Sequence, residues 1–265
     1  MSLDWAQTQT LLALGIVPAA AAKVDDYKQW VGYPAIPEQT VDIGLRSQPN
    51  IERLIELDLD TIYLSSRFLS LRTQLERIAK VRVLTARQEG KVNWQTVRNF
   101  TLAMAQDLGL TAKAQQLIVN SEQRLSRLAN RLSNNRSAVL LVQFMDRKHV
   151  RVYGENSAYQ IALNKLAVKN AWQKESNYWG YTLVGIEQLQ GIHGQIIVID
   201  PLPIGVSAQL ERDPYWQYII RTTGHSMLSL PATWSVGSIP SVMRFAEQLT
   251  RALTQENKVW ENTNE

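Results

Sequence analysis

The stretch Thr111-Ala-Lys-Ala-Gln-Gln-Leu-Ile-Val-Asn-Ser-Glu-Gln-Arg-Leu-Ser-Arg-Leu-Ala-Asn-Arg-Leu132 decides how this chain of 265 residues is organised. Its apolar and small residues recur at steps of three and four, which is the spacing of one face of an α-helix. Neither glycine nor proline interrupts the pattern. At about 1.5 Å per residue, a helix over 111–132 is a rod of about 33 Å, close to the diameter of a small domain. We therefore expect one long, stiff helix in the middle of the chain.

Alternating helix and strand patterns lie on both sides of this helix. Asn50 is the expected N-cap of one earlier helix, and Gly109 the expected end of another. Before the long helix, the sequence predicts helices over 8–14, 51–57, 71–79 and 93–108, and strands over 60–65 and 81–84. After a polar run over 133–137, it predicts strands over 138–144, 150–153 and 196–200, a helix from Asn156, and a last helix over 241–253.

This alternation indicates an α/β protein built on parallel sheets. We expect two α/β lobes joined by one long rigid helix. The N-terminal lobe takes residues 1–110, the connecting helix 111–135 and the C-terminal lobe 136–265.

Composition excludes several classes of protein. Hydrophobic residues make up 45% of the chain, so it can bury a sizeable core. The formal charge is only +4, from 28 basic and 24 acidic residues. Because no basic stripe with interleaved aromatics is present, we expect no nucleic-acid partner. The sequence contains no cysteine, which removes disulfides, thiol catalysis and thiolate metal sites together.

The apolar stretch 11–22 is neither a membrane span nor a secretion signal. It is shorter than the roughly 20 residues that a span takes, and a glycine and a proline interrupt it. Asp4 stands where a signal peptide carries basic residues. Since Met1-Ser-Leu leads straight into Asp4-Trp5, we expect that a native signal peptide has been removed.

Aromatic and amide side chains are concentrated in Asn170-Ala-Trp-Gln-Lys-Glu-Ser-Asn-Tyr-Trp179-Gly180. Flat apolar rings and amide donors in one loop are suited to holding a small, mostly neutral ligand. The alternative is an aromatic cluster that fills a core, since Trp and Tyr are often buried for structural reasons. The stretch has no His, Cys or Asp, so a catalytic role is the poorer interpretation.

The sequence lacks the signatures of the common enzyme classes. The three histidines, His149, His193 and His225, do not have the spacing of a zinc-protease helix. Gly224-His-Ser-Met-Leu228 resembles the start of a nucleophile elbow, but leucine replaces the closing glycine. No dinucleotide-binding or Walker pattern is present, and no carboxylate pair suits acid–base work. We therefore expect no catalysis.

Several segments together resemble the ferric hydroxamate siderophore-binding proteins of bacterial ABC importers, the FhuD family. The likeness runs over nearly the whole chain, and two of the segments are specific. The segments that carry it are Leu11-Leu-Ala-Leu-Gly-Ile-Val-Pro18, Val41-Asp-Ile-Gly-Leu-Arg-Ser-Gln-Pro-Asn50, Val152-Tyr-Gly-Glu-Asn-Ser157, the stretch 170–180 and Leu230-Pro-Ala-Thr-Trp234. The second and fourth are the specific ones.

This resemblance implies a monomeric periplasmic binding protein of class III, with a ligand cleft between its lobes. The ligand's own oxygens hold the Fe³⁺, so the protein supplies neither a metal ligand nor a cofactor. Arg46 matches the arginine that donates to the hydroxamate oxygens, a role that suits a fixed guanidinium. The alternative for Arg46 is a helix-capping or lobe-stabilising arginine.

The other ligand positions are also carried over from the family. Trp172 belongs to the motif but is expected to pack in the core. The expected contacts besides Arg46 are Trp5, Trp30, Phe68, Met145, Arg151, Asn177, Trp179 and Trp234.

Departures from the family concern specificity. A tyrosine of the family is Phe68 here, a second is Val236 and a cleft tryptophan is Leu64. In exchange, Arg151 replaces a leucine that contacts ligand, and Arg67 replaces a glycine. Fewer aromatics and more positive charge favour an anionic, citrate–hydroxamate type of siderophore. The alternative is that both arginines point to solvent.

Delivery to an ABC permease at the inner membrane is the second implied function. In the family, an acidic residue on each lobe pairs with arginines of the permease. Glu187 matches the position in the C-terminal lobe. Thr73 occupies the other position, and Glu76 is offered as its substitute.

Two alternatives to this function remain open. A binder of cobalamin, haem or a catecholate siderophore would have the same fold. A two-domain nucleotide-dependent transferase belongs to another class and would need a phosphate-binding loop at a helix N-terminus, which is not evident.

Overall fold

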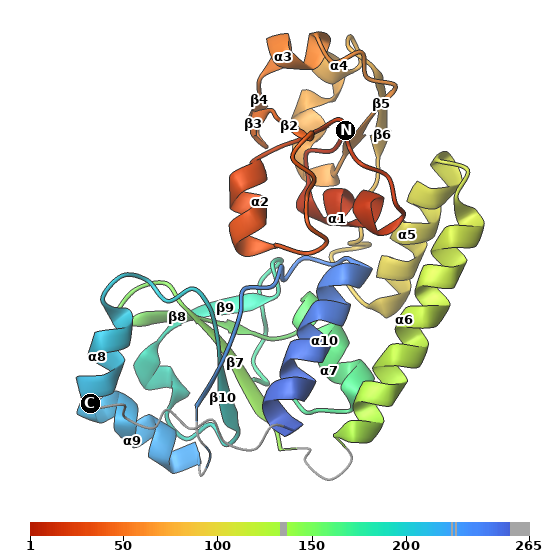
Figure 1. Ribbon diagram of the computed structural model, residues 1–265. Coiled ribbons are helices and arrows are strands. Elements are labelled where there is room, and N and C mark those ends of the chain that lie inside the picture. Colours follow the sequence, from red (N-terminus) through yellow and green to blue (C-terminus); the bar gives the residue numbers. More distant parts are fainter. Residues whose placement is uncertain (133–136, 224, 226, 255–265) are drawn as a thin grey trace. The chain divides into compact units, whose positions relative to one another are not determined.

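The computed structural model describes residues 1–132, 137–223, 225 and 227–254, and within them the chain forms two compact units (Figure 1). The first unit is Met1–Glu122 with Val236–Val242. The second is Gln123–Ser235 with the chain from Met243 on. By its contacts, Val236–Val242 therefore belongs to the first unit, whereas the sequence placed it in the C-terminal lobe. The predicted polar run 133–137 lies largely outside the described residues.

The first unit contains short strands and short helices, and its longest complete helix is α5. Its helices are α1 (Trp5–Ala13), α2 (Val24–Trp30), α3 (Ile51–Ile55), the 3₁₀ turn η1 (Ser66–Leu71), α4 (Arg72–Leu75) and α5 (Trp94–Asp107). Its strands are β1 (Ala20–Ala21), β2 (Val41–Asp42), β3 (Gly44–Leu45), β4 (Gln48–Pro49), β5 (Thr61–Leu64) and β6 (Lys80–Val83).

Residues 1–3 connect the parallel strands of this unit. Ser2 forms parallel bridges to Ala21 of β1 and to Tyr63 of β5. Since β1 pairs with β2 and β5 with β6, also in parallel, the strands follow the order β2, β1, residues 1–3, β5, β6. The core beside them contains Leu3, Ile43, Ile62, Leu64 and Leu75, all with no exposed surface. Leu64 is thus a core residue.

The helix caps follow the sequence closely. The Asn50 side chain accepts from the backbone N–H of Arg53 and caps α3, as predicted. Asn93 and Thr96 form a reciprocal capping box at the start of α5, so predicted residue 93 is the cap rather than the first helical residue. The helix α6 (Thr111–Arg131) confirms the long helix, and both units contain part of it.

The second unit is built on one mixed sheet with the strand order β11, β10, β7, β8, β9. Its strands are β7 (Val139–Phe144), β8 (His149–Tyr153), β9 (Tyr181–Gly185), β10 (Gln195–Ile199) and β11 (Leu228–Leu230). Its helices are α7 (Ala158–Leu166), η2 (Ile186–Leu189), α8 (Val206–Arg212), α9 (Pro214–Thr223) and α10 (Ile239–Thr254), which begins in the first unit.

The prediction of a parallel sheet was wrong for half of this sheet. The pairs of β10 with β7 and β11 are parallel, but β8 pairs antiparallel with β7 and with β9. The connection between β7 and β8 is only residues 145–148, which is far too short for the crossover that parallel neighbours need.

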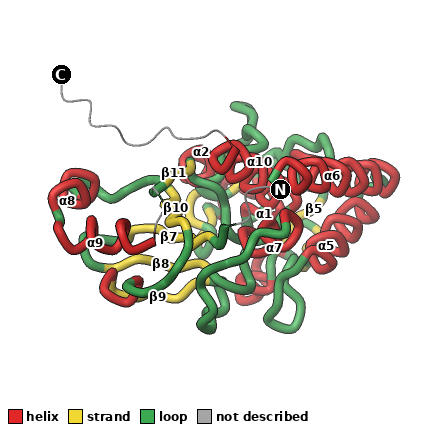
Figure 2. Tube along the Cα trace, turned by 90° about the horizontal axis from the view of Figure 1, so that it is seen from below, coloured by secondary structure: helices red, strands yellow, loops and turns green. Residues whose placement is uncertain are grey.

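Helices cover both faces of this sheet, whose strands β7 to β10 lie side by side in Figure 2. On one face, Val142, Val152 and Val198 pack with Trp216 of α9 in the same core cluster. On the other, the Tyr153 ring contacts Tyr159 of α7, which in turn contacts Phe245 of α10.

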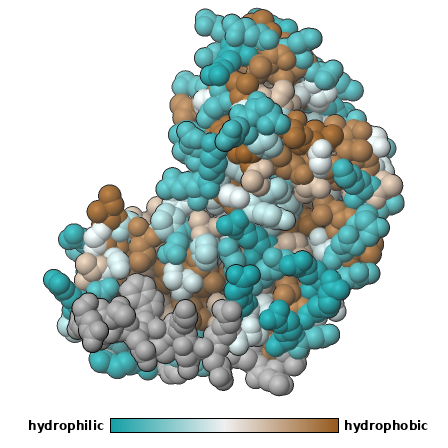
Figure 3. Space-filling model, viewed as in Figure 1, coloured by the Kyte–Doolittle hydropathy of each residue, from teal (hydrophilic) through white to brown (hydrophobic). Residues whose placement is uncertain are grey.

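The surface is mixed in polarity. In Figure 3 hydrophilic and hydrophobic residues are interspersed over the visible face, and hydrophobic ones gather over α1 and α5. Over the described part of the chain, no helix combines the length and the apolar character needed to cross a membrane.

Candidate functional site

Arg46 lies at the tip of a tight β-hairpin in the first unit. Gly44 pairs with Pro49 and Leu45 with Gln48, which leaves Arg46 and Ser47 as the turn. Gly44 has a φ of 77°, a backbone conformation that a side chain disfavours. The specific motif over 41–50 is therefore the sequence of a hairpin that presents one arginine.

Asp42 fixes this hairpin to the neighbouring helix. Its carboxylate accepts from the backbone N–H of Gly44 at 2.7 Å and from that of Val24, the first residue of α2, at 2.9 Å. The Gly44 carbonyl in turn accepts from the Lys23 N–H at 3.0 Å. Sequence reasoning missed this role of Asp42, although the residue stood inside the quoted motif.

The Arg46 guanidinium is held flat against an aromatic ring. Its central carbon lies 4.3 Å from the centroid of Trp5. Trp5 is only 4% exposed, and its indole N–H donates to the Ala22 carbonyl at 2.9 Å. Tyr27 meets the same indole edge-on, with the ring centroids 6.3 Å apart. Trp5 therefore supports Arg46 from behind, and little of its own surface is left for a ligand.

Charged side chains of both signs surround Arg46. Burial lowers the pKa of its guanidinium, Asp4 and Asp26 oppose that effect, and the positive charge of Arg67 adds to it. Arg67 is exposed, and its guanidinium carbon lies 5.3 Å from the centroid of Phe68. The unit thus brings Arg46, Trp5 and Arg67 into one neighbourhood.

The remaining site residues expected in this unit differ in exposure. Phe68 is 6% exposed and belongs to the hydrophobic core, so little of its ring is accessible. Trp30 ends α2, one turn beyond Tyr27, and is partly exposed.

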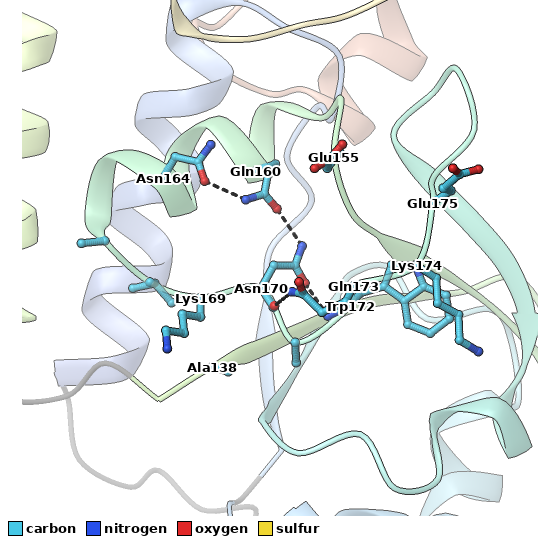
Figure 4. Close-up of a pocket in the computed structure, with 13 residues that line it drawn as sticks. Ala138, Glu155, Gln160, Asn164, Lys169, Asn170, Trp172, Gln173, Lys174 and Glu175 are labelled. Atoms are coloured by element: carbon cyan, nitrogen blue, oxygen red, sulfur yellow. Dashed lines mark hydrogen bonds between the residues drawn. The ribbon is translucent and has the colours of Figure 1, made fainter.

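In the second unit, the first half of the motif over 170–180, from Asn170 to Glu175, joins parts of the fold to one another. The Asn170 side-chain amide donates to the Tyr153 carbonyl and to Gln160 of α7, and its oxygen accepts from the Trp172 N–H. Trp172 is 3% exposed and lies in the core, which confirms the expectation that it packs there. Figure 4 shows Gln160 and Asn170 pointing toward one another.

A hollow of about 850 Å³ opens beside this network (Figure 4). Its polar rim includes Glu155, Lys169, Lys174 and Glu175. None of the ligand residues expected from the sequence lines it. The hollow therefore marks the structural half of the motif and is separate from the predicted ligand contacts.

The second half of the motif is an exposed turn. The Asn177 side-chain oxygen accepts from the N–H of Trp179 at 2.8 Å and from that of Tyr181 at 3.3 Å. Gly180 follows with a φ of 81°, and a Cβ there would lie 2.6 Å from the Asn156 carbonyl oxygen. Asn177 therefore shapes the turn that presents the partly exposed Trp179.

The other contacts expected in this unit lie on strand β8 or follow β-strands. Arg151 is the central residue of β8, and its guanidinium carbon lies 4.7 Å from the centroid of Tyr181. Met145 follows β7 and is 41% exposed. Trp234 comes after β11 and is partly exposed. Sequence reasoning missed Tyr181, because strand β9 itself was not predicted, although Tyr181, Thr182 and Val184 are of residue types enriched in strands.

The two glutamates expected to contact a permease are both exposed but differ in their partners. Glu76, at the end of α4, forms an ion pair with Arg72 at 2.7 Å. Glu187, in η2, forms no ion pair with any residue that the structure describes. Its carboxylate folds back over Gly185, where a Cβ would meet it.

Among the residues that the structure describes, no group of three or more His, Cys, Asp or Glu side chains is placed to bind a metal ion. His149, the first residue of β8, contacts the Asp146 carboxylate in the preceding exposed turn at 2.9 Å.

Comparison with known proteins identifies similar chains. Residues 1–223 match the family model described as periplasmic binding protein. The chain is 30% identical to the iron(3+)-hydroxamate-binding protein FhuD of Escherichia coli (strain K12), over 96% of this chain and 86% of that protein. It is 32% identical to the "Probable siderophore-binding lipoprotein YfiY" of Bacillus subtilis (strain 168), over 61% of this chain and 49% of that protein.

A solved structure is similar over nearly its whole length. The siderophore-binding protein FhuD from Vibrio cholerae, with bound Fe³⁺–Desferal, matches with a TM-score of 0.87 at 27% identity. The match covers 96% of this chain and 97% of that chain.

Proposed function

The chain belongs to the periplasmic binding protein family and has its class III fold, and from this premise we propose that it captures an iron(III)–hydroxamate siderophore for an ABC permease of the inner membrane. The membership confirms the family that the motifs indicated. Capture and delivery are binding functions, and the protein acts without catalysis, as a monomer in the periplasm.

The observation that carries the proposal is the Arg46 guanidinium stacked at 4.3 Å on a buried Trp5. In a ferric hydroxamate, hard oxygen atoms of the siderophore fill the coordination sphere of the iron, so the protein has only to recognise the outside of the complex. Those oxygens carry negative charge, and a guanidinium donates to them without losing its own charge at any physiological pH.

Pre-organisation makes this arrangement suitable for binding. Arginine loses rotamer freedom when it orders around a ligand. Here the hairpin, the Asp42 carboxylate and the Trp5 ring restrict Arg46 before any ligand arrives. The partly exposed rings of Trp30, Trp179 and Trp234 supply the apolar contacts that a siderophore shell needs.

Quenching of tryptophan fluorescence tests the proposal directly. Ferrichrome, ferrioxamine B and ferric aerobactin are each titrated against the protein, with N-acetyltryptophanamide as the control for light absorbed by the ligand. We expect saturable quenching at micromolar or lower concentration for at least one of them. Absence of saturable quenching by all three would contradict a hydroxamate ligand, and cobalamin, haem and catecholate complexes are then titrated in the same way.

Delivery is tested separately from capture. The protein loaded with the ferric siderophore is added to its permease in proteoliposomes, and ATP hydrolysis and iron uptake are measured. We expect loaded protein to stimulate both more than iron-free protein. Equal stimulation by the two forms would contradict delivery.

A further inference from the structure

The sheet of the second unit has two chemically different faces. In register, Arg151 of β8 pairs with Gln143 of β7 and with Leu183 of β9, and Tyr153 pairs with Tyr181. Residues paired in this way, and residues two positions apart on a strand, project from the same face. The opposite face carries Val150, Val152 and Val184, which are buried in the core.

Helices cover only part of the first of these faces. Tyr153 is buried against Tyr159 of α7 at a centroid distance of 4.7 Å, and its hydroxyl donates to Gln143 at 2.8 Å. One row further along, Leu183 is 58% exposed although it lies in the middle of a strand. Met145 is 41% exposed. We call the open part, formed by Met145, Arg151, Tyr181 and Leu183, the Arg151 face.

Arg151 lies among these side chains without an acidic partner. Among the residues that the structure describes, it forms no ion pair, whereas Arg72, Arg82 and Arg124 each pair with a carboxylate. It is half-buried and rests on the Tyr181 ring. Burial raises the pKa of the Tyr153 hydroxyl, and the charge of Arg151 and its side-chain hydrogen bond to that hydroxyl oppose the rise, so part of the guanidinium is already engaged. The guanidinium is therefore fixed in place, and since it has five N–H donors, those not used by Tyr153 are available to an anion.

Apolar side chains beside a fixed cation indicate the chemistry of a ligand that would bind to the Arg151 face. Exposed leucine and methionine are suited to hydrocarbon, and exposed apolar patches of this kind mark binding surfaces. A guanidinium prefers a carboxylate, which it can bind with two parallel hydrogen bonds. An occupant with both features is an organic anion that has apolar arms and a free carboxylate.

We propose that the Arg151 face selects ferric hydroxamate siderophores that carry a free carboxylate, with Arg151 as the residue that binds it. The proposal rests on the proposed function and specifies its substrate class. Tyr181 holds the guanidinium in position, and Met145 and Leu183 contact the apolar arms of the ligand.

The test compares two siderophores of different charge in matched variants. Ferric aerobactin carries free carboxylates, and ferrichrome is neutral. In the wild type we expect ferric aerobactin to bind more tightly. Arg151→Gln removes the charge and keeps part of the side-chain stem. We expect it to weaken ferric aerobactin by about tenfold to a hundredfold, the worth of a charge-assisted hydrogen bond, and ferrichrome by less than about threefold.

Arg147→Gln is the matched control, because Arg147 lies in the exposed turn between β7 and β8 of the same unit. It makes the same change in net charge, and we expect little effect on either ligand. Arg151→Lys keeps the charge without the planar fork, and we expect it to lose only part of the preference. Thermal unfolding of each variant checks that the fold is intact.

The outcomes separate this inference from the proposed function. If wild type binds ferrichrome and Arg151→Gln weakens both ligands equally, or if Arg147→Gln has the same effect as Arg151→Gln, the carboxylate role is wrong and siderophore binding stands. If wild type binds ferrioxamine B but neither of these two siderophores, this inference fails and the proposed function stands. If it binds none of the three, both fail.

Discussion

The guanidinium carbon of Arg46 lies 4.3 Å from the ring centroid of Trp5, and the two residues come from different elements of the first unit. The indole is anchored through its N–H to the Ala22 carbonyl, so its face is a fixed support for the cation. The chain therefore places a rigid hydrogen-bond donor where a hairpin tip would otherwise be mobile.

Arg46→Lys tests this arrangement at constant charge. Lysine cannot offer two parallel donors and does not stack as a plane, so we expect binding of a ferric hydroxamate to weaken by roughly tenfold or more. Fluorescence titration measures it. Arg53→Lys, at an exposed position of α3, is the control and should leave binding unchanged. An unchanged dissociation constant for Arg46→Lys would show that the planar fork is not used.

Asp42→Ala tests whether the hairpin needs its anchor. The change leaves the N–H groups of Val24 and Gly44 without their acceptor, and we expect about 1–2 kcal/mol less stability together with weaker ligand binding. Urea denaturation and titration measure the two effects. Asp25→Ala removes only an exposed ion pair with Lys28, so its cost should stay below about 1 kcal/mol. Equal costs for the two variants would contradict the anchoring role.

Gly180→Ala tests the turn that presents Trp179. Its φ of 81° costs an alanine about 1–2 kcal/mol, and the overlap of a Cβ with the Asn156 carbonyl adds about 1–3 kcal/mol. Gly191→Ala is the matched control, because its φ is 77° and a Cβ there would meet nothing within 4 Å. We expect Gly180→Ala to lower the free energy of unfolding more than Gly191→Ala and to weaken ligand binding as well. Binding unaffected by a shifted turn would remove Trp179 from the site.

Glu187→Gln tests delivery without changing capture. We expect unchanged siderophore affinity and a several-fold lower uptake through the permease, because an exposed charge without an internal partner contributes to docking through electrostatic complementarity. Glu211→Gln, at an exposed position of the same unit, is the control. Glu76→Gln should act more weakly than Glu187→Gln, since Glu76 already pairs with Arg72. Normal uptake with the Glu187 variant would assign docking to other residues.

Local patterns allowed a large part of the fold to be predicted. The periodicity over 111–132 predicted helix α6 to within a residue, and Asn50 caps α3 as predicted. Asn93, predicted as the first residue of its helix, is instead the cap of α5. Strand β9 and the direction of β8 were not predicted. The direction of a strand depends on the neighbour with which it pairs, and local sequence does not contain that information. Residues 181–185 directly follow the aromatic-rich stretch 170–180, which was interpreted as a loop, so the short strand after it was overlooked.

For the candidate site, motifs predicted which residues to examine but not what surrounds each one. Asn170 and Asn177 belong to one motif, yet the first joins strand β8 to α7 and the second shapes an exposed turn. Trp5 was predicted to contact a ligand; the structure shows a ring that is 4% exposed and lies under the Arg46 guanidinium, and the ligand contact stays a prediction.

By itself, the sequence determined the long helix and the family, because helical periodicity and motifs are written in the order of the residues. It also singled out Arg46, whose contact with a ligand stays a prediction. Only the tertiary structure decided which rings are buried, which arginines rest on aromatic faces and that Arg151 has no acidic partner among the described residues. These features depend on contacts between residues far apart in the chain, such as Arg46 with Trp5 and Arg151 with Tyr181. Packing, rather than local spacing, creates such contacts.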